Sequence, residues 1–78
     1  MAEFRRAFGA EVRAVRARKG MTQGGLAEQA RMARSHLSQI EAGDVSPSLD
    51  VQVRIAQALG LTIDELLRRA REEHDGKV

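Results

Sequence analysis

The sequence contains no cysteine, tryptophan or tyrosine, only one proline, and no long run of apolar residues. Without cysteine the chain has no disulfide, no thiolate metal ligand and no cysteine nucleophile, which fits a reducing compartment such as the cytoplasm. The absence of a long apolar run excludes a transmembrane helix, and residues 1–9 lack the apolar core of a signal peptide. These absences predict a cytoplasmic protein with no membrane partner.

Charge is plentiful in the chain, and it is unevenly distributed. Charged residues make up 31% and apolar residues 42% of the 78 residues, which favours one globular domain over a disordered chain. Residues 1–43 contain 8 Lys and Arg against 4 Asp and Glu, a net charge of +4, whereas residues 44–78 contain 5 against 7, a net charge of −2. A basic front half favours a polyanionic partner, although a chain solvated by mixed charges would show the same balance.

Apolar spacing and capping residues predict an all-α chain of five helices. The first helix covers about residues 3–19, because apolar side chains recur there on one helical face, and Gly20 follows a basic last turn. A second helix over about 23–30 begins after Thr22, a good N-cap, and a third covers about 34–42. Ser48 can cap a fourth helix over about 49–59, and Thr62 with Glu65 forms a capping box for a fifth over about 63–72.

The fourth helix carries two apolar stripes. We expect Leu49, Val53 and Ala56 to face the core, which leaves Val51, Ile55 and Ala58 as a second stripe beside further apolar residues of the fifth helix. A small monomer rarely exposes so much apolar area. The predicted homodimer interface consists of Val51, Ile55, Ala58, Leu61, Ile63 and Leu66. The alternative is that the second stripe packs against the fifth helix and the tail within a monomer.

Two short helices with a tight break, at about residues 22–42, have the pattern of a helix-turn-helix, whose second helix can lie in the major groove of DNA. The outward positions of that second helix are Arg34, Ser35, Ser38 and Gln39, with His36 on its flank. All five can form hydrogen bonds and none is acidic. Arginine pairs best with guanine and glutamine with adenine, so this face predicts recognition of base edges.

The sequence resembles the lambda-repressor-like, or XRE-type, family of bacterial helix-turn-helix regulators. The resemblance covers about residues 9–67, and the matching stretches are VRAVRARKGMTQ (12–23), LAEQA (26–30), RSHLSQIEAG (34–43), SPSLD (46–50) and IAQALGLTIDELL (55–67). It implies an all-α, five-helix lambda-repressor-like domain over residues 1–70. Residues 71–78 are then a charged tail that we expect to fray.

The resemblance also implies roles for individual residues. Gln23, at the start of the second helix, would bind a DNA phosphate, and Ser46, in the loop after the third helix, would contact the backbone. The outward residues of the third helix would face the bases, with His36 touching base or backbone. Arg16 would form an ion pair with Glu41 inside the fold.

The sequence departs from the family pattern at the turn and in the second helix. Gly24 and Gly25 replace better helix formers, either as tolerated glycines or to let a phosphate approach closely. Arg31 replaces the usual turn glycine, which strains the backbone by about 1 kcal/mol or more if its φ is positive. Its side chain would either add a phosphate contact or be a solvated surface arginine.

The resulting functional prediction is a sequence-specific regulator that binds double-stranded DNA as a homodimer on a near-palindromic operator. A restriction–modification controller or a phage- or plasmid-type repressor would have this size. The alternative is an antitoxin that binds a protein toxin as well as DNA. We expect no enzyme and no catalytic residues, since nucleotide-binding motifs are missing. We also expect no cofactor and no metal, because His36 has only His74 as a companion histidine.

Overall fold

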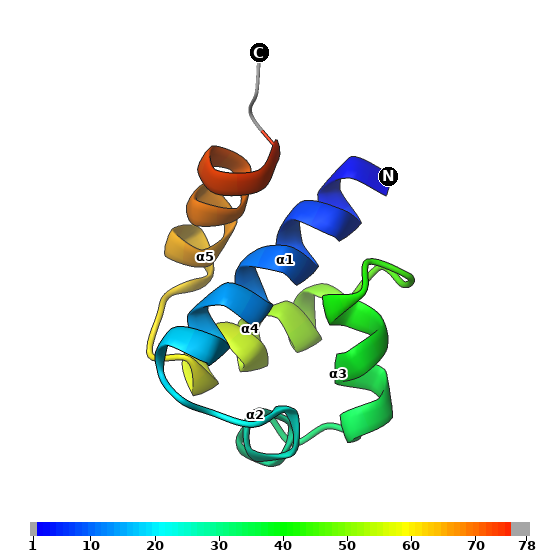
Figure 1. Cartoon of the computed structure of the whole chain (residues 1–78), viewed down its shortest axis with the longest axis vertical. Coiled ribbons are helices and arrows are strands. Elements are labelled where there is room, and N and C mark those ends of the chain that lie inside the picture. The colour runs from blue at the N-terminus through cyan, green and yellow to red at the C-terminus, as the bar shows by residue number, and fades with distance from the viewer. Residues whose placement is uncertain (1, 76–78) are drawn as a thin grey trace.

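The computed structural model describes residues 2–75, of which residues 74 and 75 are described by their backbone only. Within this range the chain is all-α (Figure 1). Its elements are α1 (Ala2–Arg18), α2 (Gln23–Gln29), α3 (Arg34–Glu41), α4 (Leu49–Ala58), α5 (Ile63–Ala70) and the π-helical segment η1 (Arg71–Asp75). The predicted five-helix, all-α fold is confirmed.

Three of the helices begin at the predicted caps. The hydroxyl of Thr22 accepts a hydrogen bond from the Gly25 N–H at 2.9 Å, and that of Ser48 accepts one from the Val51 N–H at 3.2 Å. The hydroxyl of Thr62 and the carboxylate of Glu65 exchange the two bonds of a capping box. Each bond satisfies a backbone donor that the first turn of a helix leaves free. These local signals therefore fix where the short helices start.

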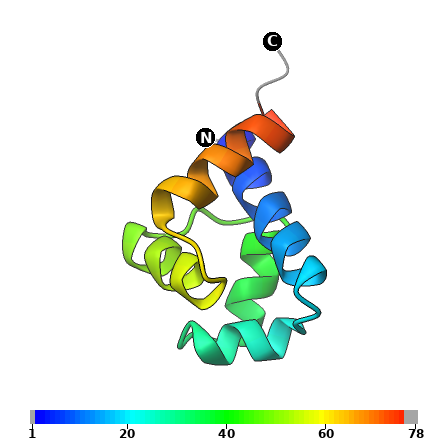
Figure 2. The same ribbon diagram turned by 90° about the vertical axis from the view of Figure 1, so that its left-hand side faces the viewer.

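Helix α1 is the central element of the fold. It contacts α3 and α5, which lie on opposite sides of it (Figures 1 and 2). Side chains from all five α-helices fill the core around it. The large core side chains with less than 2% exposure are those of Phe8, Val12, Leu26, Leu37, Ile40, Ile55, Leu59 and Leu66. The core thus anchors α3 through two residues, Leu37 and Ile40, and leaves its outward face exposed.

Gly9 sets the distance between α1 and α3. A Cβ atom at this position would overlap the carbonyl oxygen of Ile40 and lie 2.9 Å from that of Glu41. Because both obstacles are backbone atoms, no side-chain rotation could relieve the overlap. The close approach therefore needs glycine, and it holds the C-terminal end of α3 directly against α1.

The buried face of α4 differs from the predicted one. Val51 and Ile55, assigned from the sequence to an exposed dimer stripe, are 8% and 0% exposed and belong to the core of the single chain. Leu66 of α5, assigned to the same interface, is 0% exposed. Leu49, expected in the core, is 67% exposed, and Val53 is half-buried. The cause is that α4 packs between α2 and α5, which turns the Val51–Ile55 stripe inward. The predicted interface is wrong at these three buried residues.

The segment after α5 also differs from the prediction of a frayed tail. Arg71–Asp75 continues α5 as η1, and η1 packs against α1. The described part of the predicted tail is therefore helical and lies beside α1, although Arg71, Glu72 and Glu73 are exposed. The rest of the predicted tail, residues 76–78, lies outside the described residues.

Candidate nucleic-acid interface

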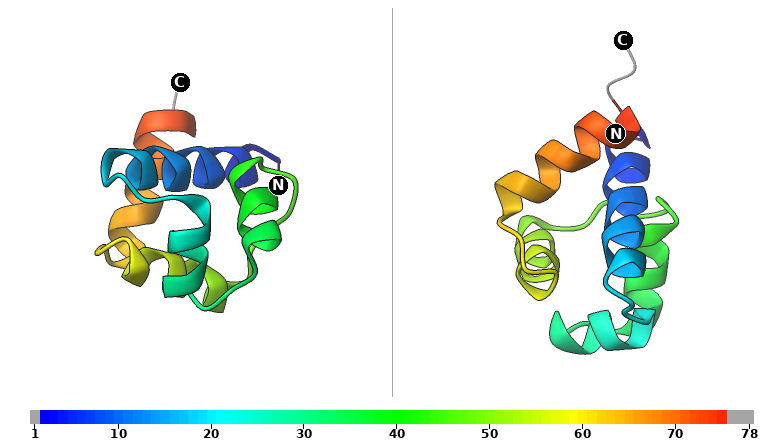
Figure 3. Two further views of the ribbon diagram at one scale, coloured as in Figure 1. Left: turned by 60° about the horizontal axis from the view of Figure 1, so that its bottom comes forward. Right: turned by 60° about the vertical axis from the view of Figure 1, so that its left-hand side comes forward.

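Helices α2 and α3 lie crosswise at one edge of the molecule and are joined by a tight turn (Figure 3). The turn is closed by a hydrogen bond from the Met32 N–H to the Ala27 carbonyl at 2.9 Å. Arg31 occupies the left-handed position of the turn with φ of 58°, the only positive φ of a non-glycine residue between residues 2 and 75. This is the geometry of a helix-turn-helix, with the expected strain at Arg31.

The outward face of α3 is polar and free of acidic side chains. Arg34, Ser35, Ser38 and Gln39 are exposed, and His36 is half-buried on the flank. Leu37 and Ile40, which are fully buried, hold the opposite side of the helix in the core. The exposed side chains supply hydrogen-bond donors and acceptors of the kinds that contact base edges in a groove.

Arg34 also connects α3 with the beginning of α2. A Cβ atom built on Gly24 would lie 3.9 Å from Cδ of Arg34, so the arginine stem passes over the first turn of α2. That distance is an ordinary van der Waals contact, and an alanine would fit at Gly24. At Gly25 a Cβ would lie 3.2 Å from the capping oxygen of Thr22, which is tighter. Only Gly25 therefore has a local steric reason to be glycine.

An ion pair between Arg16 and Glu41 joins α1 to the end of α3. The Arg16 Nε and Nη2 atoms donate to the two carboxylate oxygens of Glu41 at 2.7 and 3.0 Å, and Nη1 donates to the carbonyl of Met21 at 2.9 Å. The Glu41 side chain is 4% exposed and that of Arg16 15%. The hydrogen bonds to Glu41 raise the pKa of Arg16 above its ordinary value, so the Arg16 guanidinium is charged at any physiological pH.

Gln23, the expected phosphate ligand, is part of the same network. Its Nε2 donates to Glu41 Oε1 at 3.0 Å, so the first residue of α2 is fixed to α3. The amide keeps a second N–H for another acceptor. Sequence reasoning did not find this bond, because side-chain geometry across 18 residues of chain leaves no local signal.

Beside this network lies a shallow cleft of about 240 Å³ between α1 and α3. It is lined by Arg13, Arg16, Gln23, Ser38, Glu41 and Ala42. Arg13 is exposed, and sequence reasoning assigned it no role. The available signal was its place three residues before Arg16, which puts both side chains on neighbouring positions of one helix face. The cleft thus brings two predicted residues, Gln23 and Ser38, together with one that was missed.

Ser46 lies apart from α2 in the chain segment between α3 and α4, where it is exposed, as is Asp44. This segment leaves α3 through Gly43, whose φ is 79°. A Cβ at Gly43 would lie 3.0 Å from the Arg6 side chain and 3.2 Å from its Cα, so the segment starts tightly against α1. The structure therefore ties the beginning of this loop to α1 and leaves Ser46 on the surface.

Comparison with known proteins gives one family. A model of the helix-turn-helix domain matches residues 7–70. The chain belongs to the helix-turn-helix domain family. It is 34% identical to the clp gene regulator ClgR from Corynebacterium glutamicum, with a TM-score of 0.86 over 91% of this chain and 76% of that chain. It is also 32% identical to the restriction-modification controller protein C.AhdI from Aeromonas hydrophila, with a TM-score of 0.77 over 80% of this chain and 94% of that chain.

A curated relative comes from a phage. The immunity repressor protein of Bacillus phage phi105 is 32% identical over 75 residues, which cover 88% of this chain and 52% of the repressor. The chain therefore spans about half the length of this relative. With these relatives and this fold, the helix-turn-helix chain is of the XRE-like, lambda-repressor-like type, as the sequence predicted. Among residues 2–75, no helix is long and apolar enough to span a membrane. Among the side chains of residues 2–73, no three His, Asp or Glu cluster as metal ligands would.

Proposed function

We propose that this chain is a transcriptional regulator that binds double-stranded DNA sequence-specifically, with α3 in the major groove. The observation that carries the proposal is the outward face of α3, where Arg34, Ser38 and Gln39 are exposed and unopposed by acid on a helix anchored by Leu37 and Ile40. The solved relatives, named as a gene regulator and a controller protein, support it.

In the proposed complex, two kinds of contact have different roles. Arg34 and Gln39 bind base edges, Ser35 and Ser38 add shorter contacts, and His36 touches base or backbone. Gln23 and Arg13 bind phosphates from the cleft between α1 and α3, and Ser46 does so from the loop after α3. Phosphate contacts fix the orientation of α3, and base contacts supply the sequence preference.

The regulator acts as a homodimer on a near-palindromic operator, in the manner of a restriction–modification controller or a phage repressor. Helix α3 has 8 residues, so it is about 12 Å long and reaches only about four base pairs. So short a sequence recurs too often for useful specificity. Two copies related by a two-fold axis would contact half-sites about 34 Å apart, which doubles the sequence that is read.

The test starts by selecting a preferred duplex from a random library with the purified chain. Arg34→Ala should weaken binding to that duplex by about 1–3 kcal/mol and relax the preference at one base pair per half-site. Gln23→Ala should weaken binding to all duplexes alike. Unchanged affinity and preference in Arg34→Ala would show that α3 does not read the sequence.

A further inference from the structure

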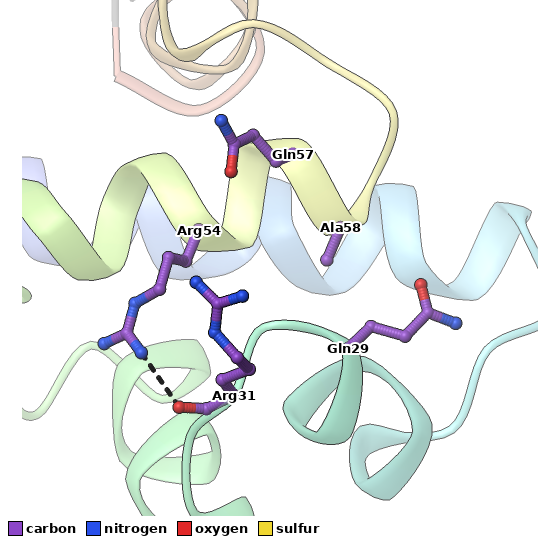
Figure 4. A pocket seen from close by; sticks show the side chains of 5 residues that line it. All are labelled: Gln29, Arg31, Arg54, Gln57 and Ala58. Atoms are coloured by element: carbon purple, nitrogen blue, oxygen red, sulfur yellow. Dashed lines mark hydrogen bonds between the residues drawn. The ribbon is translucent and has the colours of Figure 1, made fainter.

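A second cleft, of about 350 Å³, lies between the end of α2 and α4, away from the cleft that contains Gln23. Its lining consists of Gln29, Arg31, Arg54, Gln57 and Ala58 (Figure 4). At about 30 Å³ per water molecule, it has room for about ten waters, or for a small ionic group that is part of a larger molecule. None of its lining side chains is acidic, and four of the five carry N–H donors.

Two arginines share this cleft. The Arg54 side chain descends from α4, and the Arg31 side chain rises beside it from the helix-turn-helix turn (Figure 4). The Arg54 Nη1 donates to the carbonyl oxygen of Arg31 at 2.9 Å, which fixes the turn to α4. The bond fixes the Arg54 guanidinium beside the turn from which the Arg31 side chain starts, so both positive charges line one cleft.

Little in the chain compensates these charges. The carboxylate of Asp50 lies 3.4 Å from Arg54 Nε, but its side chain is 80% exposed, so the pair is weak. The same Nε atom is buried without a hydrogen-bond partner. The guanidinium of Arg31 forms no ion pair or hydrogen bond with any side chain or backbone group of residues 2–73. Two such charges in one cleft favour an anion between them.

The backbone of Arg31 adds an independent argument. Its φ of 58° is a conformation in which glycine would be unstrained. The side chain offsets none of this strain within the described chain, because its guanidinium forms no hydrogen bond or ion pair there and projects into the cleft. A bound ligand would give the arginine a function that glycine could not supply.

We propose that this cleft is a phosphate-binding site, in which the guanidinium groups of Arg31 and Arg54 hold the oxygens of one phosphate group. Phosphate suits the site better than a lone carboxylate, since its oxygens are arranged tetrahedrally and can meet two planar guanidinium forks at once. The phosphate group belongs either to the DNA backbone, since Arg31 lies three residues before Arg34, or to a free phosphate-bearing molecule. The site itself goes beyond the proposed function. Only the assignment of the phosphate to DNA rests on that function.

The first arm of the test titrates inorganic phosphate into the ¹⁵N-labelled chain at constant ionic strength, with chloride as the reference anion. We expect saturating shifts at the amides of Gln29, Arg31, Arg54 and Gln57. Arg31→Gln should weaken this binding at least tenfold, and the control Arg69→Gln, which changes an exposed arginine of α5, should not. Arg31→Gly should also lose binding while its melting temperature rises, which separates the site from any folding defect.

The second arm identifies the source of the phosphate with a 20-base-pair duplex of random sequence. If the group is a DNA phosphate, Arg31→Gln binds the duplex more weakly than Arg69→Gln, and the slope of log K against log salt falls by about 0.9. If the group belongs to a free molecule, the duplex affinities of the two variants are equal although Arg31→Gln has lost phosphate binding. Either result supports the site.

Three results would overturn it. Equal shifts in phosphate and chloride, or identical behaviour of Arg31→Gln and Arg69→Gln in the phosphate arm, would leave Arg31 as a solvated surface side chain. Saturating shifts with an oligoglutamate peptide but none with phosphate would mean that the cleft takes carboxylates instead. A wild-type chain that fails to bind any duplex would reject the proposed function, and the phosphate arm would still decide the cleft.

Discussion

At the residue scale, the acidic side chain of Glu41 is the centre of a hydrogen-bond network. It receives two hydrogen bonds from Arg16 and one from Gln23, and so joins three helices at the end of α3. A carboxylate that is only 4% exposed has lost most of its hydration, and these three donors replace it. The position of α3 therefore depends on partners in α1 and α2.

This network predicts strong coupling between Arg16 and Glu41. Arg16→Met or Glu41→Leu alone should each lower the free energy of unfolding by about 3–5 kcal/mol, because each leaves an uncompensated charge or donor behind. The loss of unfolding free energy in the double variant should be smaller than the sum of the two single losses, by about 1–3 kcal/mol. Urea unfolding of the four proteins measures this. Additive effects would contradict it.

The sequence predicted some of these residues and missed others for a physical reason. Arg16 and Glu41 followed from the family resemblance, and the left-handed backbone of Arg31 from its place between two short helices. The bond from Gln23 to Glu41 and the place of Arg13 in the cleft did not follow, because they depend on the crossing of helices far apart in the chain. Local sequence patterns predict the backbone conformation, whereas the packing of distant helices determines which side chains become partners.

At the scale of elements, helix ends were predictable and helix rotation was not. Caps such as Thr22 and Ser48 act within one turn, so the sequence alone locates them. In α4, by contrast, the stripes of Leu49 with Val53 and of Val51 with Ile55 both fit the helical period. Only contacts with α2 and α5 decide which stripe is buried, and these contacts lie in no local pattern.

The capping box of α5 gives a pH-dependent prediction. The backbone N–H of Thr62 donates to the Glu65 carboxylate and, with smaller help from its other neighbours, lowers the pKa of Glu65 from its ordinary value of 4.5. A lowered folded-state pKa means that the cap stabilises the fold above that ordinary value and loses its contribution as the pH falls through the lower one. At neutral pH, wild type should therefore unfold less readily than Glu65→Gln.

The measurement is urea unfolding of both proteins at pH 7, 5, 4 and 3, followed by helical circular dichroism. We expect the stability difference to be constant between pH 7 and 5 and to shrink below pH 4.5. A direct NMR titration of the Glu65 carboxyl provides the matching control. A difference that does not vary with pH would mean that the carboxylate makes no charge-dependent contribution to the cap.

At the scale of the whole molecule, the recognition helix and the α4–α5 edge lie on opposite sides (Figures 2 and 3). With Val51, Ile55 and Leu66 in the core, the apolar surface left on that edge is smaller than the sequence predicted. The predicted interface residues that stay half-buried there are Ala58 at the end of α4, Leu61 in the connection and Ile63 at the start of α5. Half-buried Leu67 of α5 and exposed Leu49 of α4 are further apolar residues of these two helices. Pairing through this edge would leave both copies of α3 free for DNA.

The proposed homodimer can now be tested at a predicted interface residue that is only half-buried. Ile55→Glu would unfold the chain, since Ile55 is fully buried, so we choose Ile63→Glu at the start of α5. Sedimentation equilibrium at micromolar concentration should give twice the chain mass of 8.6 kDa for wild type and the mass of one chain for Ile63→Glu. Ala17→Glu, an equal charge change on an exposed residue of α1, should remain dimeric.

Because a dimer doubles the base pairs contacted, Ile63→Glu should also lose most of its affinity for the selected duplex while keeping its helical circular dichroism. A single-chain mass for wild type, both free and on that duplex, would contradict the dimer. A dimeric Ile63→Glu would instead move the interface to another face.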